Sequence, residues 1–364
     1  MNIIENLIEN VDNQIIKIRT KSLDVSFNEL YDMYKDGELI ISPDYQRLFR
    51  WGAEKQSRFV ESLLLEMPVP PIFVIETGEG VYELIDGLQR ISSYLHFRGE
   101  QLLGNLNSSG LVLDGCDIVS DLNGLKFNDL PKALQIKMKR SFVRMEVIRK
   151  ESEAALKYYM FKRLNTGGEL LSEQEIRNCT IRLLDSTAIN FIEECSQNKD
   201  FQNAIRRVGE DKLNMRYDQE LVVRFFAIKN DIDNYRYPVN DYLTRFLEKV
   251  TEQSINFDYN KERFIFNATF SFINRKFGSD AFSGRKISGE ARNEFIHYYF
   301  DAITIPISIL IEALINRGDN TDVIELIEKL KYSETLMKHK TGSVDNVKAR
   351  IKIFMEGVQN ILDC

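Results

Sequence analysis

Cysteine and histidine are scarce in this sequence, and neither is spaced for a metal site. The residues concerned are Cys116, Cys179, Cys195, Cys364, His96, His297 and His339. No Cys-x-x-Cys pair occurs, whereas zinc sites usually need such pairs or closely spaced cysteine and histidine ligands. The sequence therefore indicates no metal centre of this kind. The scattered thiols are typical of a protein kept in a reduced, cytoplasmic compartment.

Proline, glycine and long apolar runs are also limited. With 7 prolines and 19 glycines, the chain has no Pro-rich or Gly/Ser-rich linker, so we expect any domain boundary to be packed. The first residues lack a basic segment followed by an apolar one, so we expect no signal peptide. The longest apolar stretch, near residues 303–314, is interrupted by Pro306 and Glu312 and is too short for a bilayer about 30 Å thick. We expect a buried helix there and no membrane association.

Positive charge does not dominate the composition. The formal net charge is −7, whereas proteins that bind DNA along an extended face are usually basic. Local basic clusters do occur, over residues 137–150 and over a loop at 338–343 that leads into a helix containing Arg350. We interpret both as solvated helix ends and surfaces, with DNA contact as the less favoured alternative.

The two halves of the sequence differ in pattern. Up to about residue 150, short β-branched runs alternate with amphipathic helices, and helical periodicity continues almost throughout the rest. Strands are predicted over residues 72–75, 81–85 and 142–148, with a hairpin turn at Gly78 and Gly80. Helices are predicted over 54–66, 88–97, 152–164, 218–229, 261–277, 291–317, 321–331 and 345–362, and a capping box at Ser172 and Glu175 starts one more. The sequence thus predicts an α+β domain over residues 1–180 and an all-α helical domain over 181–364.

The segment from Val81 to Phe97 carries the clearest pattern for a ligand site. A strand runs into Asp86-Gly87 and then into a helix, whose first N–H groups lack intrahelical acceptors and attract anions. Gly87 permits close approach of the backbone, Gln89 can donate its amide, and Arg90 can form a bidentate contact with phosphate. Asp86 can cap the helix or hold a metal. A polyphosphate suits this arrangement; the alternative is a structural turn in which Asp86 caps the helix and Arg90 pairs with a carboxylate.

Further segments accompany this turn in a fixed order. They are Tyr45-Gln46-Arg47 before Trp51, Pro70-Pro71-Ile72, Arg163-Leu164-Asn165-Thr166-Gly167-Gly168, and Leu171-Ser172 before Glu175-Ile176-Arg177-Asn178. Together with Ile85-Asp86-Gly87-Leu88-Gln89-Arg90, this order resembles the DGQQR family of ParB/sulfiredoxin-like domains, which includes GmrSD-type and SspE-type phage-defence proteins. The resemblance extends from about residue 20 to residue 180.

The resemblance implies a ParB/sulfiredoxin-like fold for the first domain and the use of a nucleoside triphosphate. The nucleotide-binding residues that it implies are Gln46, Arg47, Asp86, Gly87, Gln89, Arg90 and Asn165. Of these, Asp86 and Asn165 match positions that support hydrolysis and are the predicted catalytic residues. Two positions depart from the pattern: Leu88 stands in place of a glutamine and Leu164 in place of a glutamate. The side chain of leucine can neither form a hydrogen bond nor bind a metal. No metal ligand is therefore assigned at either position.

Together these features predict a nucleoside-triphosphate-binding and hydrolysing sensor or regulatory subunit of a DNA-targeting anti-phage restriction system. Mg²⁺ is a candidate cofactor, and the expected partners are DNA (including modified phage DNA), a separate nuclease chain and a second copy of this chain. The isolated histidines offer no HNH-type nuclease context, which favours a nuclease on another chain. Two alternatives stay open: the chain nicks or cuts DNA by itself, or it is a nucleotide-gated scaffold that binds DNA or protein without hydrolysis.

Overall fold

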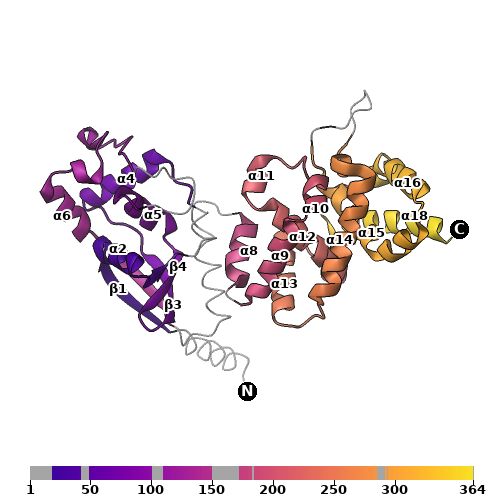
Figure 1. The fold of residues 1–364 in the computed structure, drawn as a ribbon, viewed down its shortest axis with the longest axis horizontal. Helices are drawn as coiled ribbons and strands as arrows, with labels where there is room; N and C mark the ends of the chain where they lie inside the picture. The colour runs from indigo at the N-terminus through magenta and orange to yellow at the C-terminus, as the bar shows by residue number, and fades with distance from the viewer. Residues whose placement is uncertain are drawn as a thin grey trace, which may run out of the picture. The chain divides into compact units, whose positions relative to one another are not determined.

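The chain forms two compact units, residues 1–170 and 171–364 (Figure 1). The structure is a computed structural model, and it describes residues 19–41, 49–100, 110–149, 172–182, 184–284, 292 and 294–363. The helix predicted over 152–164 lies outside these ranges. The boundary predicted at residue 180 falls inside helix α8 (Glu173–Arg182), which packs against helices of the second unit.

A five-stranded mixed sheet lies at the centre of the first unit. Its strands are β1 (Thr20–Ser26), β2 (Leu39–Ile40), β3 (Ile72–Gly78), β4 (Val81–Asp86) and β5 (Phe142–Ile148), in the spatial order β1-β5-β3-β4-β2. The β1–β5 and β3–β4 pairs are antiparallel, and the β3–β5 and β2–β4 pairs are parallel. The three predicted strands and the hairpin between β3 and β4 are confirmed, whereas β1 and β2 were not predicted.

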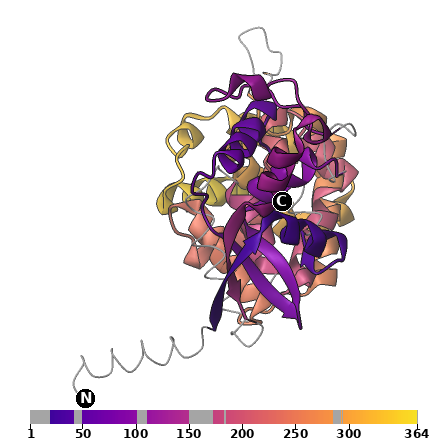
Figure 2. The same cartoon turned by 90° about the vertical axis from the view of Figure 1, so that its left-hand side faces the viewer.

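Four helices of the first unit gather on one side of the sheet (Figures 1 and 2). They are α2 (Phe27–Lys35), α4 (Ala53–Leu64), α5 (Leu88–Phe97) and α6 (Lys132–Arg140), with the short 3-10 turns η1 (Ser120–Leu122) and η2 (Phe127–Asp129) before α6. Phe27 is fully buried, and its ring contacts those of Phe59 and Tyr94 on α4 and α5. Side chains alternate along β5, so that Val143 and Met145 are buried while Phe142 and Arg144 are exposed. The start of β5 therefore leaves one face open to solvent.

The described part of the second unit contains helices and no strands. The helices after α8 are α9 (Ser186–Ser196), α10 (Lys199–Ala204), α11 (Glu210–Asn214), α12 (Tyr217–Asp231), η3 (Ile232–Asn234), α13 (Val239–Thr251), α14 (Tyr259–Phe277), η4 (Gly278–Asp280), α15 (His297–Arg317), α16 (Thr321–Lys331), α17 (Glu334–Met337) and α18 (Val344–Leu362). The predicted helices in this half are confirmed to within a few residues, although α15 begins at His297 rather than at 291. Helix α12 is central, because it contacts α8, α9, α13 and α15 and buries residues such as Leu221, Phe225 and Phe226.

Helix α15 contains the longest apolar stretch and is buried, as expected. At 21 residues the helix is longer than the apolar stretch near residues 303–314, and by length and composition alone it could cross a membrane. However, 67% of its most apolar window is buried inside the protein, as in an ordinary core helix. Helices α12, α14 and α18 pack around it.

A buried ion cluster links α12, α15 and α18. The carboxylate of Asp301 accepts two hydrogen bonds from Arg224, at 2.5 and 2.6 Å, and a third from Arg350. Burial would raise the pKa of the Asp301 carboxyl, but the two guanidinium groups outweigh burial and hold that pKa below its ordinary value. Arg350 also donates to the carbonyl oxygens of His339 and Thr341 and is fully buried. It therefore fixes the loop before α18 and, contrary to the sequence interpretation, is not part of a solvated basic face.

Candidate functional site

The predicted ligand site lies where β4 turns into α5, and its geometry depends on Gly87. Gly87 adopts a φ of +107°, a left-handed conformation that disfavours other residues. A Cβ atom added there would lie 2.5 Å from Cγ2 of Ile72 on β3, a contact that real Cβ atoms do not make. The strand, the turn and the helix are therefore packed so closely that only glycine fits. This close packing is against β3, and the close approach of the Gly87 backbone to a ligand stays a prediction.

Arg90 lies in the first turn of α5 and is held in place by two oxygen atoms. Its Nη2 donates to Oδ2 of Asp86 at 3.0 Å and to the carbonyl oxygen of Pro71 at 2.9 Å. Only 16% of the Arg90 side chain is exposed. Its Nε is buried and has no hydrogen-bond partner among the described residues. A buried donor without an acceptor costs free energy. The Nε–H group of Arg90 can therefore still donate to a further acceptor, and such a contact would remove that cost.

Asp86 does not cap α5. The N-cap residue of the helix is Gly87, and no side chain caps it. Instead, the Asp86 carboxylate is one-third exposed and pairs with Arg90 across one turn of the helix. The capping role considered for Asp86 was therefore wrong, and the pairing of Arg90 with a carboxylate, also considered, is present. The exposed part of the Asp86 carboxylate stays accessible to solvent.

Gln89 holds the loop that precedes α4. Its Oε1 accepts hydrogen bonds from the backbone N–H groups of Arg50 and Trp51, at 3.0 and 3.1 Å. The Trp51 ring packs edge-on against Phe59, and Gln56 donates to the Trp51 carbonyl oxygen at 2.7 Å. Gln89 thus joins the segment that ends at Trp51 to the β4–α5 turn. This link was not predicted, since the sequence suggested only that Gln89 donates to a ligand.

The His96 imidazole is packed in the interior of the first unit. It is buried, and its Nδ1 lies 2.9 Å from Oε1 of Gln56. The same Gln56 side chain therefore ties α4 to both α5 and the Trp51 loop.

Three predicted site residues, Gln46, Arg47 and Asn165, lie outside the described residues. The motif that follows Asn165 is described, and the capping box there is confirmed: Ser172 N–H donates to Oε2 of Glu175 at 2.8 Å, and Glu175 N–H donates back to Ser172 Oγ at 3.2 Å. Arg177 is 1% exposed and donates to Thr244 on α13. This last motif therefore builds the helical unit. Within the described ranges, no group of three His, Cys, Asp or Glu side chains could hold a metal ion.

Replacement of Gly87 by alanine is expected to destabilise the first unit by about 2–4 kcal/mol, because strain at positive φ adds to overlap with Ile72. Urea unfolding of the variant measures this loss. Gly80 in the β3–β4 turn is a matched control: its φ is +73°, but a Cβ there would meet no atom within 4 Å. Gly80→Ala should therefore cost only the backbone part, and equal losses for both variants would contradict the close packing at Gly87.

The comparison with known families concerns the first unit and the start of the second. Residues 27–182 match the family model described as the N-terminal domain of the GmrSD restriction endonuclease. The match covers 156 of the 364 residues and includes the whole β4–α5 turn and α8. No curated protein and no solved structure matches the chain. Residues 27–182 are therefore similar to the N-terminal domain of a restriction endonuclease family in phage defence, for which DNA is the suggested substrate.

Proposed function

We propose that this chain binds and hydrolyses a nucleoside triphosphate and acts as the sensor or regulatory subunit of a DNA-targeting anti-phage restriction system. The nuclease of that system is carried by a separate chain. The turn between β4 and α5 is the centre of the nucleotide site. Gln46, Arg47 and Asn165 complete the site, and a ParB/sulfiredoxin-like fold surrounds it.

The observation that carries the proposal is the position of Arg90 at the start of α5. Its Nη2 is anchored by Asp86 and Pro71, while its buried Nε has no acceptor among the described residues. The N–H groups of the first helical turn and the positive end of the helix dipole lie beside it. Together these donors favour a ligand with several negative charges, and a polyphosphate is such a ligand.

Asp86 supplies a partly exposed carboxylate next to these donors. Mg²⁺ that accompanies a nucleotide usually binds the phosphates and one or two carboxylates, and it keeps several waters. We assign to Asp86 the contact with this nucleotide-bound Mg²⁺ or with the attacking water, and to Asn165 a supporting amide. When bound, Mg²⁺ would neutralise part of the phosphate charge.

The regulatory role rests on a site for a charged ligand in a chain whose isolated histidines offer no HNH-type nuclease context. A nucleotide can bias the arrangement of a protein only if it binds two states with different affinity. Hydrolysis would then end the signal and return the chain to its starting state. The similarity to a restriction endonuclease domain supports DNA as the target of the complete system.

The proposal is tested by a binding and hydrolysis panel of nucleoside triphosphates, with and without Mg²⁺, on the purified full chain. Asp86→Ala and Asn165→Ala should lower the hydrolysis rate more than they weaken nucleotide binding, because both residues are assigned to chemistry. Asp117→Ala serves as a control, since Asp117 is 65% exposed and pairs with Arg58. Wild-type hydrolysis rates in both site variants would rule out the assigned roles. Plasmid cutting by the lone protein, lost on Asp86→Ala, would instead favour a self-contained nuclease.

A further inference from the structure

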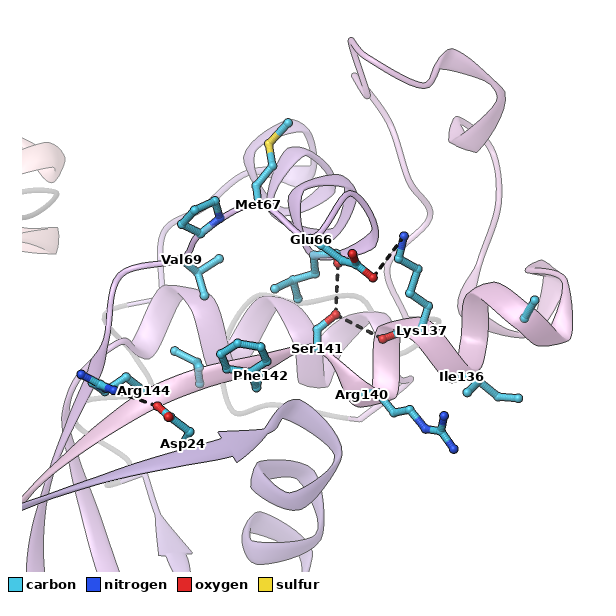
Figure 3. Close-up of a pocket in the computed structure, with 14 residues that line it drawn as sticks. Asp24, Glu66, Met67, Val69, Ile136, Lys137, Arg140, Ser141, Phe142 and Arg144 are labelled. Atoms are coloured by element: carbon cyan, nitrogen blue, oxygen red, sulfur yellow. Dashed lines mark hydrogen bonds and ion pairs between the residues drawn. The ribbon is translucent and has the colours of Figure 1, made fainter.

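A groove on the first unit lies apart from the β4–α5 turn and has no role in the proposed nucleotide site. Its volume is about 770 Å³, and it is lined by the end of α4, the segment 66–69, α6 and the first residues of β5 (Figure 3). This volume is typical of sites that enclose a ligand.

The groove keeps apolar side chains in contact with water. Phe142 is 66% exposed, and Met67 and Ile136 are each 40% exposed. Phe142 is the first residue of β5, and the alternation along the strand points it away from the buried side chain of Val143. An exposed aromatic ring at the mouth of a groove is a surface for stacking or packing by a ligand.

Three cations surround this apolar surface. Lys137 pairs with Glu66 at 3.4 Å and Arg144 pairs with Asp24 at 3.2 Å, and all four side chains are substantially exposed. Arg140, at the end of α6, has no carboxylate partner among the described residues. Exposed ion pairs contribute little to stability, so Lys137 and Arg144 can exchange their carboxylates for other anions. The groove thus combines the Phe142 ring with cations that precede it in the sequence, Lys137 and Arg140, and one that follows it, Arg144.

We infer that this groove binds an unpaired segment of DNA. A base stacks on Phe142, and the neighbouring phosphates lie against Arg140, Arg144 and Lys137. Grooves that bind single strands use this combination of cations along the backbone and aromatic rings for the bases. A duplex hides its base faces in the stack, so the exposed ring favours a single strand. The inference rests on the proposed action on DNA, and it does not depend on nucleotide binding at Arg90.

Fluorescence anisotropy of a labelled oligothymidine of about 12 nucleotides, added to the full chain, tests the groove. Phe142→Ala should weaken binding about tenfold or more, because a stacking surface is lost, whereas Phe142→Trp should retain it. Arg140→Ala should weaken binding and reduce the slope of log affinity against log salt by about one unit. Tyr237→Ala, which removes a 73% exposed ring of the second unit, and Lys352→Ala, which removes an exposed charge, are the matched controls.

The outcomes separate this inference from the nucleotide site. Phe142→Ala protein that still binds nucleotide but has lost the oligonucleotide supports the groove, as does Arg90→Ala protein with the reverse behaviour. The inference is overturned if wild-type protein does not bind the oligonucleotide, or if Phe142→Ala and Tyr237→Ala bind it equally. It is also overturned if a duplex of the same length binds as tightly as the single strand. Loss of a co-purifying protein from Phe142→Ala, with oligonucleotide binding unchanged, would assign the groove to a protein partner instead.

Discussion

Replacing Asp301 with asparagine is expected to lower the free energy of unfolding by about 3–5 kcal/mol, because it leaves two buried guanidinium groups without a counter-charge. Asp301 and Arg350 are fully buried, and Arg224 is 9% exposed. Three segments far apart in the sequence meet at this carboxylate. Chemical denaturation followed by circular dichroism measures the change. Since α12, α15 and α18 all contribute to the cluster, we expect the whole second unit to lose stability together.

Asp322→Asn is the matched control for this variant. Arg317 donates two hydrogen bonds of 2.8 Å to the Asp322 carboxylate, but this pair lies at the surface, so its loss should change stability little. The contribution of Asp301 also depends on pH. Its folded pKa lies below the unfolded value of about 3.9, so its stabilisation is present above that pH and is lost as the pH falls through the folded pKa. Equal stability losses for the two variants would refute a special role of the buried cluster.

Replacing Arg90 with alanine is expected to weaken nucleotide binding about tenfold to a hundredfold, the loss of roughly 1.5–3 kcal/mol for a charge-assisted contact. Arg90→Lys should restore only part of the affinity, because an ammonium group cannot reproduce the planar arrangement of guanidinium donors. Isothermal titration calorimetry with the nucleotide that binds best in the panel gives the affinities. Both variants also lose the hydrogen bonds of Arg90 Nη2 to Asp86 and Pro71, which could destabilise the fold. The melting temperature of each variant is therefore first compared with that of wild type.

Arg58→Ala provides the comparison for Arg90, since Arg58 lies on α4 of the same unit and 52% of its side chain is exposed. Its nucleotide affinity should equal that of wild type. An Arg90→Ala protein that is folded and binds nucleotide with unchanged affinity would leave the Arg90–Asp86 pair as a structural contact only. The proposed nucleotide site would then lose its central residue.

Local patterns predicted the elements that depend on local chemistry. The strand–glycine–helix turn and the helix over residues 88–97 follow from one glycine and one amphipathic segment, and the structure has the helix at those bounds. The capping box of Ser172 and Glu175 was likewise predicted from the spacing of these two residues, and the structure contains it. By contrast, β1 and α2 were overlooked, although Ser26 caps α2 by accepting from the N–H of Glu29, a spacing that the sequence contains. The residues of β1 are mostly polar and show no strand pattern in the sequence. The segment is a strand because it pairs with β5.

The turn at the candidate site could be predicted from the sequence, but its contacts could not. Asp86, Gly87 and Arg90 are neighbours in sequence, so a local pattern brings them together. The Pro71 carbonyl that anchors Arg90 and the Trp51 loop that Gln89 holds come from other elements, and only the tertiary packing determines them. The same is true of Arg350: its charge predicted an exposed face, whereas the carboxylate of Asp301 and two loop carbonyl oxygens make its burial favourable.

The order of strands in the sheet also determines when the first unit can fold during synthesis. Among the described strands of the sheet, β1 is made before β5, its pairing partner, by more than a hundred residues: Ser26 pairs with Phe142, and Thr20 with Ile148. β5 also lies between β1 and β3, so it joins the two parts of the sheet. Closing so long a loop costs entropy before the pairing stabilises the chain, which slows folding. Until Ile148 has emerged, β1 has no strand to pair with and one edge of β3 stays open, so the nascent unit is exposed to aggregation throughout that interval.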